Sequence, residues 1–496
     1  METLSRRRWF QIFGASAMGT MALGLAGSGQ SRSMWSKREY PDRPVLLKNV
    51  RLIDLDKELA EEQFSDIKLE KGRISLIAPA GKTDSRGLEV IEGNNGFILP
   101  GLIDCHVHIC GIFITELPGV ADLDWLFKQM SLNHRAQLQS GVTLTRDMMS
   151  ATRVSLQYKS KAEDPFSGFP RVLCSGPMFT VEGGYPPYIP KIKAWQRALA
   201  GTLKLEVKDQ KEAVSWVDRL AESGVDWIKI GYQSAYFDMA RTPMKKPSPE
   251  LFKAIVDRAH HHGLPVGVHH YWLKDLKELM DLPFDTLEHI TEDGEIDART
   301  LRKMAERKLP VTSDLEQSAF AREPHKFLRR IEDGKSYLMP RPKREITQLL
   351  NDVAAGKDIY GLKPRQKLME LAFIKDLVFQ KMRNLKLLSD NKILIGAASD
   401  SGVHMMMGIL PEELCRMAGA GLSNTQVLRS ATVDAAKLLR VDDVGQIKLG
   451  YRGDFVIYEG NPLEDIEAVR KPALVIRDGV PQIFPTGTQA KNSSPV

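Results

Sequence analysis

The stretch GLIDCHVHI, residues 101–109, ends an apolar run with two histidines, His106 and His108, that are separated by a single residue. In an extended strand, side chains at positions i and i+2 point to the same face. The two imidazoles therefore face the same way at the end of a strand. Because imidazole is a common metal ligand, the stretch indicates either a metal site or a chance spacing, and the rest of the chain must decide.

Eight short apolar segments in the middle of the chain alternate with amphipathic stretches of helical period. The segments cover residues 97–104, 142–147, 171–176, 226–230, 264–269, 285–290, 309–313 and 392–400. Alternating strands and helices are typical of a parallel α/β architecture, and eight such units predict a (β/α)8 TIM barrel. The alternative, a doubly wound open sheet, requires a glycine-rich phosphate loop after its first strand, and the sequence has none there.

The regions on either side of this middle part have a β pattern. Residues 45–100 and 445–484 contain short alternating runs interrupted by Gly, Asp and Asn, which predict strands. Two β-rich ends around a different middle indicate one small β-sandwich domain built from both. The predicted organisation is a composite β-sandwich domain (30–96 and 447–484), a barrel (97–446) and a disordered tail (485–496).

Two connections in the predicted barrel are long. Residues 177–207 follow the third strand and are rich in Pro and aromatic residues, and residues 314–391 join strands seven and eight through helical stretches. Insertions after barrel strands lie at the active-site face, so we expect substrate specificity to depend on them. Arg322, Lys326 and Arg329 are candidates for meeting a substrate carboxylate, although a charge run is usually a solvated helix face.

The N-terminus has the pattern of an export signal. Residues 1–29 contain the arginine pair Arg7-Arg8, then an apolar stretch, then small residues, which predicts a twin-arginine signal peptide. An ordinary secretory signal is the alternative. No later segment reaches the roughly 18 consecutive apolar residues of a membrane span, so we expect no stable membrane insertion. The expected location is the bacterial periplasm, with the twin-arginine export machinery as a partner.

Composition is ordinary for a globular protein. The 496 residues are 43% hydrophobic and 27% charged, with a formal net charge of +6. This modest net charge does not indicate a surface that binds nucleic acid, so we expect no nucleic-acid partner. Four cysteines are too few for a disulfide framework. Free thiols are the favoured interpretation, and a single bridge stays open.

Residues that can bind a metal recur at the ends of the predicted strands. Lys229 lies in the fourth strand, His269 ends the fifth, His289 lies in the sixth and Asp400 ends the eighth. Singly, each has an ordinary explanation: a hydrogen-bonded histidine, a solvent-facing lysine, a capping aspartate. In a barrel strand, however, a buried lysine costs several kcal/mol unless it is paired. All these ends meet at one rim, so together with His106 and His108 they predict a metal centre.

This set of residues resembles the amidohydrolase superfamily. The resemblance extends from about residue 45 to 470 and includes GVTLTRDM (141–148), GVDWIKI (224–230), DTLEHI (285–290) and the segment 421–466. It is nearest to the binuclear branch that contains imidazolonepropionase-like proteins and dipeptidases cleaving Xaa-Arg or Xaa-Pro bonds. Members of this branch carry a carboxylated lysine on the fourth strand, and relatives commonly assemble into homo-oligomers.

The resemblance implies a binuclear metal site and a hydrolytic reaction. His106, His108 and Asp400 would bind one divalent ion, and His269 and His289 the other. A carbamate on Lys229 and a hydroxide would bridge them, with Zn²⁺ the most expected metal. The implied reaction is hydrolysis of an amide or peptide C–N bond in a small substrate, such as a dipeptide or an N-acyl amino acid. The bridging hydroxide would attack, Asp400 would shuttle the proton, and Tyr271 would lie near the substrate carbonyl or carboxylate.

Several alternatives stay open at this point. Lactone or ester hydrolysis would use the same metals. A mononuclear deaminase, or a cyclic amide or imidazolone-type ring hydrolase, would not use Lys229, and a binding protein on this scaffold would have lost a ligand position. The sequence departs from relatives at ASDSG (398–402) and at Tyr185, where a histidine is frequent. We expect His404 to line the pocket, and we treat His270 and residues 260–262 as non-ligands.

Overall fold

The computed structural model describes residues 44–60, 63–109, 123–187, 202–236, 241–319, 323–332, 340–355, 364–402 and 406–482. The predicted signal peptide (1–29), the predicted tail (485–496), Arg322 and His404 lie outside these described residues. None of the helices in the described ranges combines the length and apolar character that crossing a bilayer requires.

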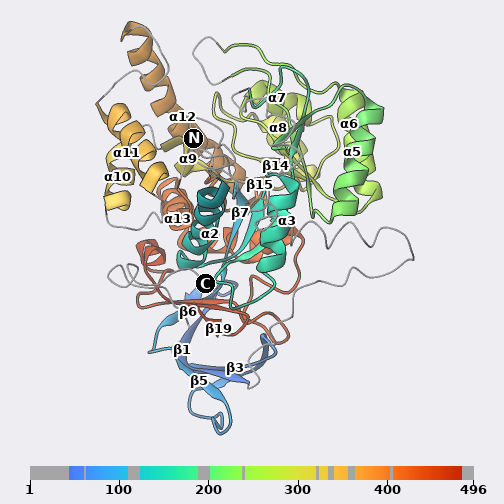
Figure 1. Cartoon of the computed structure of the whole chain (residues 1–496). Coiled ribbons are helices and arrows are strands. Elements are labelled where there is room, and N and C mark those ends of the chain that lie inside the picture. The colour runs from blue at the N-terminus through green and yellow to red at the C-terminus, as the bar shows by residue number, and fades with distance from the viewer. Residues whose placement is uncertain are drawn as a thin grey trace, which may run out of the picture. The chain divides into compact units, whose positions relative to one another are not determined.

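Strands from both ends of the described chain pair in one nine-stranded sheet, drawn in blue and red in Figure 1. Its order is β19-β18-β17-β6-β1-β3-β4, with β2 and β5 also paired to β1. These strands are β1 (Val45–Asp54), β2 (Leu59–Ala60), β3 (Ser65–Glu70), β4 (Arg73–Pro79), β5 (Glu89–Glu92), β6 (Phe97–Pro100), β17 (Phe455–Tyr458), β18 (Pro472–Arg477) and β19 (Val480–Pro481). The antiparallel pairing of β17 with β6 joins the two chain segments directly. That these strands form a sandwich stays a prediction.

The middle of the chain forms parallel sheets of seven and three strands, in the orders β11-β10-β12-β13-β14-β15-β16 and β7-β8-β9. The strands are β7 (Leu102–Val107), β8 (Val142–Asp147), β9 (Arg171–Cys174), β10 (Met178–Thr180), β11 (Lys204–Glu206), β12 (Ile228–Gly231), β13 (Val266–His269), β14 (Thr286–Glu288), β15 (Val311–Thr312) and β16 (Ile395–Gly396). Strands such as β7, β8, β12 and β13 are buried along their whole length. Burial on both faces is typical of parallel strands and extends to their charged residues, such as Arg146 in β8 and Lys229 in β12.

Backbone hydrogen bonds also join the two parallel sheets to each other in two places. On one side, Cys105 N donates to Ala397 O at 2.9 Å, which places β7 beside β16. On the other side, Asp226 N donates to Cys174 O at 2.8 Å, which places β9 beside the start of β12. The result is a TIM-barrel-like α/β fold in which the carboxyl ends of the parallel strands share one end.

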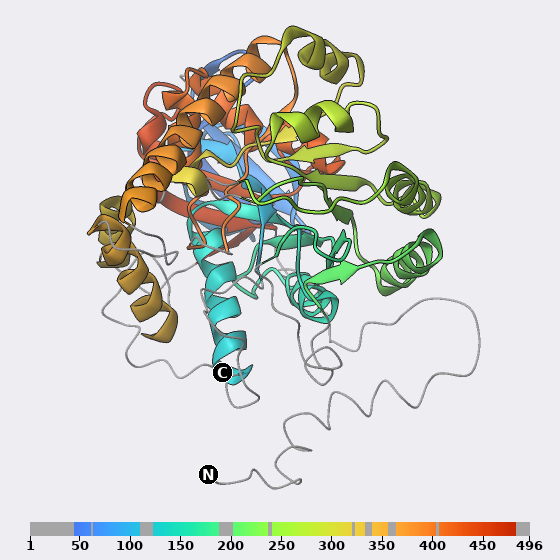
Figure 2. The same ribbon diagram turned by 90° about the horizontal axis from the view of Figure 1, so that it is seen from above.

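Helices surround these strands when the molecule is seen from above (Figure 2). They are α2 (Leu123–Gln139), α3 (Thr152–Lys161), α5 (Gln210–Ser223), α6 (Pro249–His261), α7 (Leu273–Leu279), α8 (Ala298–Glu306), α9 (Leu315–Ala319), α10 (Pro324–Glu332), α11 (Pro340–Ala354), α12 (Pro364–Asp390), α13 (Leu410–Gly419), α14 (Asn424–Ser430), α15 (Val433–Leu439) and the 3-10 helix η2 (Ile466–Arg470). Local chemistry sets several boundaries. The Asp209 side chain caps α5 by accepting from Glu212 N, and Gly224 ends that helix in the left-handed region at φ 91°.

Two segments differ from the strands that the sequence predicts. The predicted strand 97–104 is divided at Pro100: β6 joins the nine-stranded sheet, and only β7 belongs to the parallel sheets. Gly101 permits this close crossing, because a Cβ there would lie 2.1 Å from Thr143 Oγ1. The predicted connection 177–207 contains β10 and β11, both in the seven-stranded sheet. Each has three residues, too few for a periodic pattern to be recognised.

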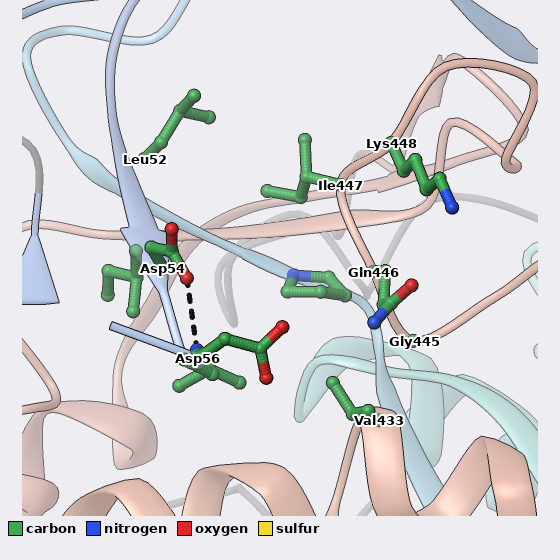
Figure 3. A pocket seen from close by; sticks show the side chains of 11 residues that line it. Leu52, Asp54, Asp56, Val433, Gly445, Gln446, Ile447 and Lys448 are labelled. Carbon is green, nitrogen blue, oxygen red and sulfur yellow. Dashed lines mark hydrogen bonds between the residues drawn. The ribbon is translucent and has the colours of Figure 1, made fainter. Parts of the chain in front are cut away.

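A pocket of about 360 Å³ lies between β1 and residues 445–448 (Figure 3). Its acidic side chains are already engaged. Asp54 Oδ1 accepts from the backbone nitrogens of Asp56 and Lys57 at 3.0 and 3.1 Å, and Asp56 pairs with Arg429. None of the predicted metal ligands lines this pocket.

A buried histidine in α2 makes stability depend on pH. His134 stacks on Tyr158 and Phe169 with ring centroids 4.6 and 4.9 Å apart, and neither of its ring nitrogens has a hydrogen-bond partner among the described residues. Burial lowers the pKa of His134 from 6.5 to about 3. Below pH 6.5 the unfolded chain therefore takes up a proton that the folded chain does not. Stability is full above that pH and falls as pH drops through the window.

His134→Phe is expected to raise the free energy of unfolding by about 1 kcal/mol at neutral pH, because an unsatisfied buried polar group is removed. At about pH 5 the gain should grow by about 2 kcal/mol more, since the proton uptake by the unfolded histidine is gone. Urea unfolding of both proteins at the two pH values measures this. An equal fall in stability with pH for both proteins would contradict it.

Candidate metal centre and active site

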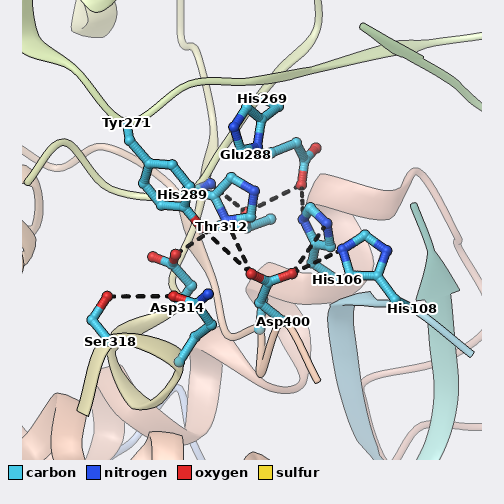
Figure 4. Close-up of polar contacts among 12 residues, drawn as sticks. His106, His108, His269, Tyr271, Glu288, His289, Thr312, Asp314, Ser318 and Asp400 are labelled. Atoms are coloured by element: carbon cyan, nitrogen blue, oxygen red, sulfur yellow. Dashed lines mark hydrogen bonds and ion pairs between the residues drawn. The ribbon is translucent and has the colours of Figure 1, made fainter. Parts of the chain in front are cut away.

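The structure brings all six predicted ligands to one buried place at the carboxyl ends of the parallel strands. Figure 4 labels all of them except Lys229. They are His106 in β7, His108 one residue beyond it, Lys229 in β12, His269 at the end of β13, His289 directly after β14 and Asp400 four residues after β16. Parallel strands deliver these side chains to a single rim, as the barrel topology predicts.

Asp400 lies at the centre of the first group of donors. Its Oδ1 is 3.0 Å from His108 Nε2 and 3.7 Å from His106 Nε2. Lys229 Nζ lies 3.5 Å from the same His106 nitrogen. Although two imidazole nitrogens are close, Asp400 Oδ1 makes no hydrogen bond within the described part of the chain. A buried carboxylate oxygen without a bonded proton donor is suited to a cation.

Two of these separations fit a zinc-type site. Ligands about 2.0–2.2 Å from zinc in a tetrahedral arrangement lie about 3.4 Å from one another, and the distances from Asp400 Oδ1 to the two histidine nitrogens, 3.0 and 3.7 Å, bracket this value. Ligand atoms of His106, His289 and Asp400 all lie within 4.8 Å of one another. Imidazole nitrogens with a carboxylate are a donor set that zinc and similar divalent ions prefer. The residues present therefore fit a bound divalent metal.

His269 and His289 form the neighbouring part of the site. Their ring centroids are 4.7 Å apart. His269 Nε2 donates to Gln233 Oε1 at 2.7 Å, and His289 Nδ1 donates to Asp314 Oδ2 at 3.1 Å. In each ring one nitrogen is thus fixed by an oxygen acceptor, which leaves the lone pair of the other nitrogen available.

The protonation states of these groups suit metal binding. Burial lowers the pKa of His106, His269 and His289 well below the usual value, which keeps the imidazoles neutral at neutral pH. Burial alone would raise the pKa of Asp400, but His289 and His108 hold it below its ordinary value. Burial also lowers the pKa of Lys229 to about 8. About a tenth of Lys229 is then the neutral amine at pH 7, the form that reacts with carbon dioxide.

Tyr271 lies across the site from His108. Its hydroxyl donates to Asp400 Oδ2 over 3.5 Å, and its ring stacks on His289 with centroids 4.6 Å apart. Burial raises the pKa of Tyr271 well above its usual value. The phenol is therefore protonated at neutral pH and available as a hydrogen-bond donor beside the proposed proton acceptor.

Comparison with known proteins now decides the family. The family model described as "Amidohydrolase family" matches residues 97–481. The chain belongs to the amidohydrolase family. This confirms the resemblance that the sequence indicated, and the match covers both the parallel strands and the strands that follow them in the nine-stranded sheet.

Individual relatives of this amidohydrolase are distant. A 5-methylthioadenosine/S-adenosylhomocysteine deaminase of Carboxydothermus hydrogenoformans is 37% identical over 87 residues, 16% of this chain and 19% of that protein. An uncharacterised protein of Mycobacterium tuberculosis is 27% identical over 47% of this chain and 53% of its own length. The chain thus matches about a fifth and about half of these two relatives. The structure of a Xaa-Pro dipeptidase with methionine bound in its active site is 20% identical, with a TM-score of 0.69 over 88% of this chain and 99% of that one.

The amidohydrolase site also contains two residues to which sequence reasoning gave no role. Glu288 accepts from His106 Nδ1 at 2.7 Å and from Arg146 Nη2 at 2.9 Å through each carboxylate oxygen. Arg146 and Glu288 are fully buried. A carboxylate behind a histidine ligand fixes its tautomer and ring orientation. Gly267 makes room for this arrangement, because a Cβ there would lie 2.5 Å from Glu288 Oε1.

Two of the candidate ligands are among the described non-glycine residues with a left-handed backbone. His289 has φ 77° and Asp400 has φ 47°. Non-glycine residues rarely adopt such angles, and where they do the conformation frequently serves a site. At His289 the left-handed backbone follows directly on Glu288. This explains how two successive residues both reach the metal site although neighbours on a strand normally point to opposite faces.

A small cavity opens beside the candidate ligands. Besides five of them, its lining consists of Met148, Met149, Met178, Tyr185 and Gln317. Tyr185 stacks on His269 with ring centroids 3.9 Å apart, so this aromatic residue faces the site. The described lining beyond the ligands is thus uncharged and largely apolar.

Other histidines and basic residues lie away from the candidate ligand positions. His270 Nε2 is 3.1 Å from Thr291 Oγ1 and buried. His260 and His262 pair with surface carboxylates of Asp285 and Asp218. Lys326, considered as a partner for a substrate carboxylate, pairs with buried Glu316 instead.

Proposed function

We propose that this amidohydrolase hydrolyses an amide or peptide C–N bond in a small substrate, such as a dipeptide or an N-acyl amino acid. The observation that carries the proposal is the buried Asp400 carboxylate, with Oδ1 facing His106 and His108 and Oδ2 facing the Tyr271 hydroxyl. The fold shared with a Xaa-Pro dipeptidase supports it, and so does the family.

The proposed cofactors are two divalent ions, most simply Zn²⁺. His106, His108 and Asp400 would hold one, His269 and His289 the other, with a carbamate on Lys229 between them. When bound, such ions polarise a substrate carbonyl and make water acidic enough to react at neutral pH. The low pKa of Lys229, about 8, supports the carbamate, since a cation in this position would repel the metals and its conversion to an anion would attract them.

The side chains supply the remaining steps. Asp400 would take the proton of the attacking water at Oδ2 and pass it to the leaving nitrogen. Its pKa lies below the ordinary value, so the carboxylate is ionised at neutral pH. The hydrogen bond that Oδ2 accepts from the Tyr271 hydroxyl is long, at 3.5 Å, and leaves this oxygen able to accept the proton. The Tyr271 hydroxyl would donate to the carbonyl oxygen as negative charge develops there. The burial of these residues keeps bulk water from competing for the same hydrogen bonds.

A second candidate is a mononuclear deaminase. The 37% identity over 87 residues with a deaminase favours it. Deamination at a mononuclear site leaves the strand lysine without a use, whereas Lys229 here is buried and lies 3.5 Å from His106 Nε2. The same point argues against an imidazolone-type ring hydrolase, whereas hydrolysis of a lactone would use the same residues and differ only in substrate.

The reaction class is tested by incubating the metal-loaded protein with dipeptides, N-acyl amino acids, lactones and adenosine-type nucleosides. Release of a free amino acid from the first two classes, abolished in Asp400→Asn, supports the proposal. Ammonia release from nucleosides, with no amide cleavage, would replace it with the deaminase. Turnover of lactones alone would keep the site and change the substrate.

The apolar cavity wall predicts the preferred substrates. Burying a charged group against Met148, Met149 and Met178 costs free energy, whereas thioether side chains adapt to apolar groups of various shapes. In a series with one exchanged side chain, we expect kcat/KM for leucine or methionine to exceed that for aspartate or glutamate by about 10-fold or more, equal to about 1.4 kcal/mol. Initial rates across the series measure this, and a preference for the acidic members would contradict the assignment of the wall.

A further inference from the structure

A second buried carboxylate and cation lie behind His289. Asp314 follows β15, and its Oδ2 accepts from His289 Nδ1 at 3.1 Å and from Lys381 Nζ at 2.7 Å. Lys381 Nζ is also 3.2 Å from Glu292 Oε2. The side chains of Lys381 and Asp314 have no solvent exposure, and that of Glu292 is 2% exposed. The ammonium is therefore sealed inside the protein between two carboxylates.

The same cation contacts Tyr271. Lys381 Nζ lies 4.5 Å from the centroid of the Tyr271 ring, the face that a cation prefers. A backbone hydrogen bond also connects two partners of Lys381, since Glu292 N donates to Tyr271 O at 3.0 Å. Lys381 thus contacts two groups of the site. One is the Asp314 carboxylate, which orients His289. The other is the ring of Tyr271, the candidate hydrogen-bond donor to the substrate carbonyl.

This arrangement repeats that of His106, Glu288 and Arg146 with a cation of different origin. Arg146 belongs to β8, so the fold itself supplies it. Lys381 belongs to α12 (Pro364–Asp390), the long helix in the connection between β15 and β16. The long connection 314–391 therefore brings a charged side chain back to the metal site.

We propose that Lys381 is a positioning residue of the metal centre: its ammonium holds Asp314 against His289 and holds the Tyr271 ring in place. The inference rests on the proposed function, because His289 and Tyr271 act there. A carboxylate that accepts from His289 Nδ1 fixes the tautomer in which Nε2 keeps its lone pair for a metal. Without Lys381, Asp314 and Glu292 would face each other uncompensated, and the hydrogen bond to His289 would lose its fixed partner.

A purely structural role for Lys381 makes different predictions. A buried ion pair is weak support for a fold, and apolar replacement of a whole pair is frequently neutral. An anchor for α12 would affect unfolding only. A positioning residue would change the metal affinity and the environment of the bound metal.

The test compares Lys381→Met with Lys381→Arg and with the control Lys386→Met, an exposed ion-paired lysine on the same helix. Zinc affinity is measured on metal-free protein by competition with a chromophoric chelator, and the cobalt(II)-substituted proteins are compared by their visible spectra. For Lys381→Met we expect about 10- to 100-fold weaker binding of at least one metal and an altered cobalt spectrum. Lys381→Arg should recover part of the affinity, and Lys386→Met should match the wild type.

Unchanged affinity and spectrum in Lys381→Met, with only a lower unfolding temperature, would overturn the inference and leave the proposed function intact. A wild-type protein that binds no metal would overturn both. If Lys381→Met does not fold, the double variant Lys381→Met/Glu292→Gln removes one uncompensated charge along with the cation and keeps Asp314. Weaker binding in that variant than in Glu292→Gln alone supports a contribution from Lys381, and equal binding in the two overturns it.

Discussion

Exchange of Asp400 for asparagine is expected to lower kcat by about 10³-fold, the effect typical of removing a general base. The amide has nearly the same shape as the carboxylate but takes up no proton. It would also place an NH₂ group or a neutral oxygen opposite His108 Nε2, which lies 3.0 Å from Asp400 Oδ1. Steady-state kinetics with the substrate found in the panel measures the loss.

A matched control is Asp275→Asn. Asp275 is equally buried, but it accepts from Ser234 and Lys246 and contacts none of the candidate ligands. We expect this variant to keep kcat within a few-fold of the wild type. If Asp400→Asn keeps more than a tenth of the wild-type kcat, Asp400 is not the proton shuttle.

Replacement of Arg146 by methionine is expected to lower the free energy of unfolding by about 3–5 kcal/mol, the cost of leaving a buried charge without its partner. Arg146 donates to both oxygens of Glu288 at 2.9 Å and to Cys105 O at 2.7 Å. Its guanidinium also lies 4.3 Å from the centroid of the Trp227 ring. The variant would leave Glu288 with a full charge against His106 and no cation, and urea unfolding measures the result.

The double variant Arg146→Met/Glu288→Gln serves as the control for this effect. Because it removes the charge as well as its partner, it should recover part of the lost stability, so that the two changes are not additive. A loss below about 1 kcal/mol in the single variant, or a double variant that costs the sum of both single changes, would contradict the assigned role of the pair.

Much of the fold can be predicted from the sequence because the buried parallel strands are apolar and end in chemically distinct residues. The predicted segments 264–269 and 285–290, which contain His269 and His289, are examples, and the structure has strands β13 and β14 there. The division at Pro100 escapes such an analysis, since residues 97–104 are one apolar run and only pairing with β17 reveals two strands. The strands β10 and β11 are too short to show a period.

The candidate ligands could be predicted from the sequence, whereas the residues that orient them could not. A strand pattern places Glu288 on the opposite face from His289, and only the backbone angle of φ 77° brings both to the site. Lys381 lies 67 positions after Asp314. The sequence predicts a helix around Lys381 but not where that helix packs, because docking depends on contacts that no local pattern encodes.

The metal content per chain tests whether the protein has the proposed binuclear site. The wild-type protein and Lys229→Ala are prepared in the presence of bicarbonate, and bound metal is measured by elemental analysis. We expect about two metal ions per chain in the wild type and the loss of at least one in Lys229→Ala. The reason is that the buried lysine, with its pKa of about 8, would provide the carbamate between the ions. One metal ion in both proteins would contradict the binuclear site, and no tightly held metal in either would contradict a metal-dependent hydrolase altogether.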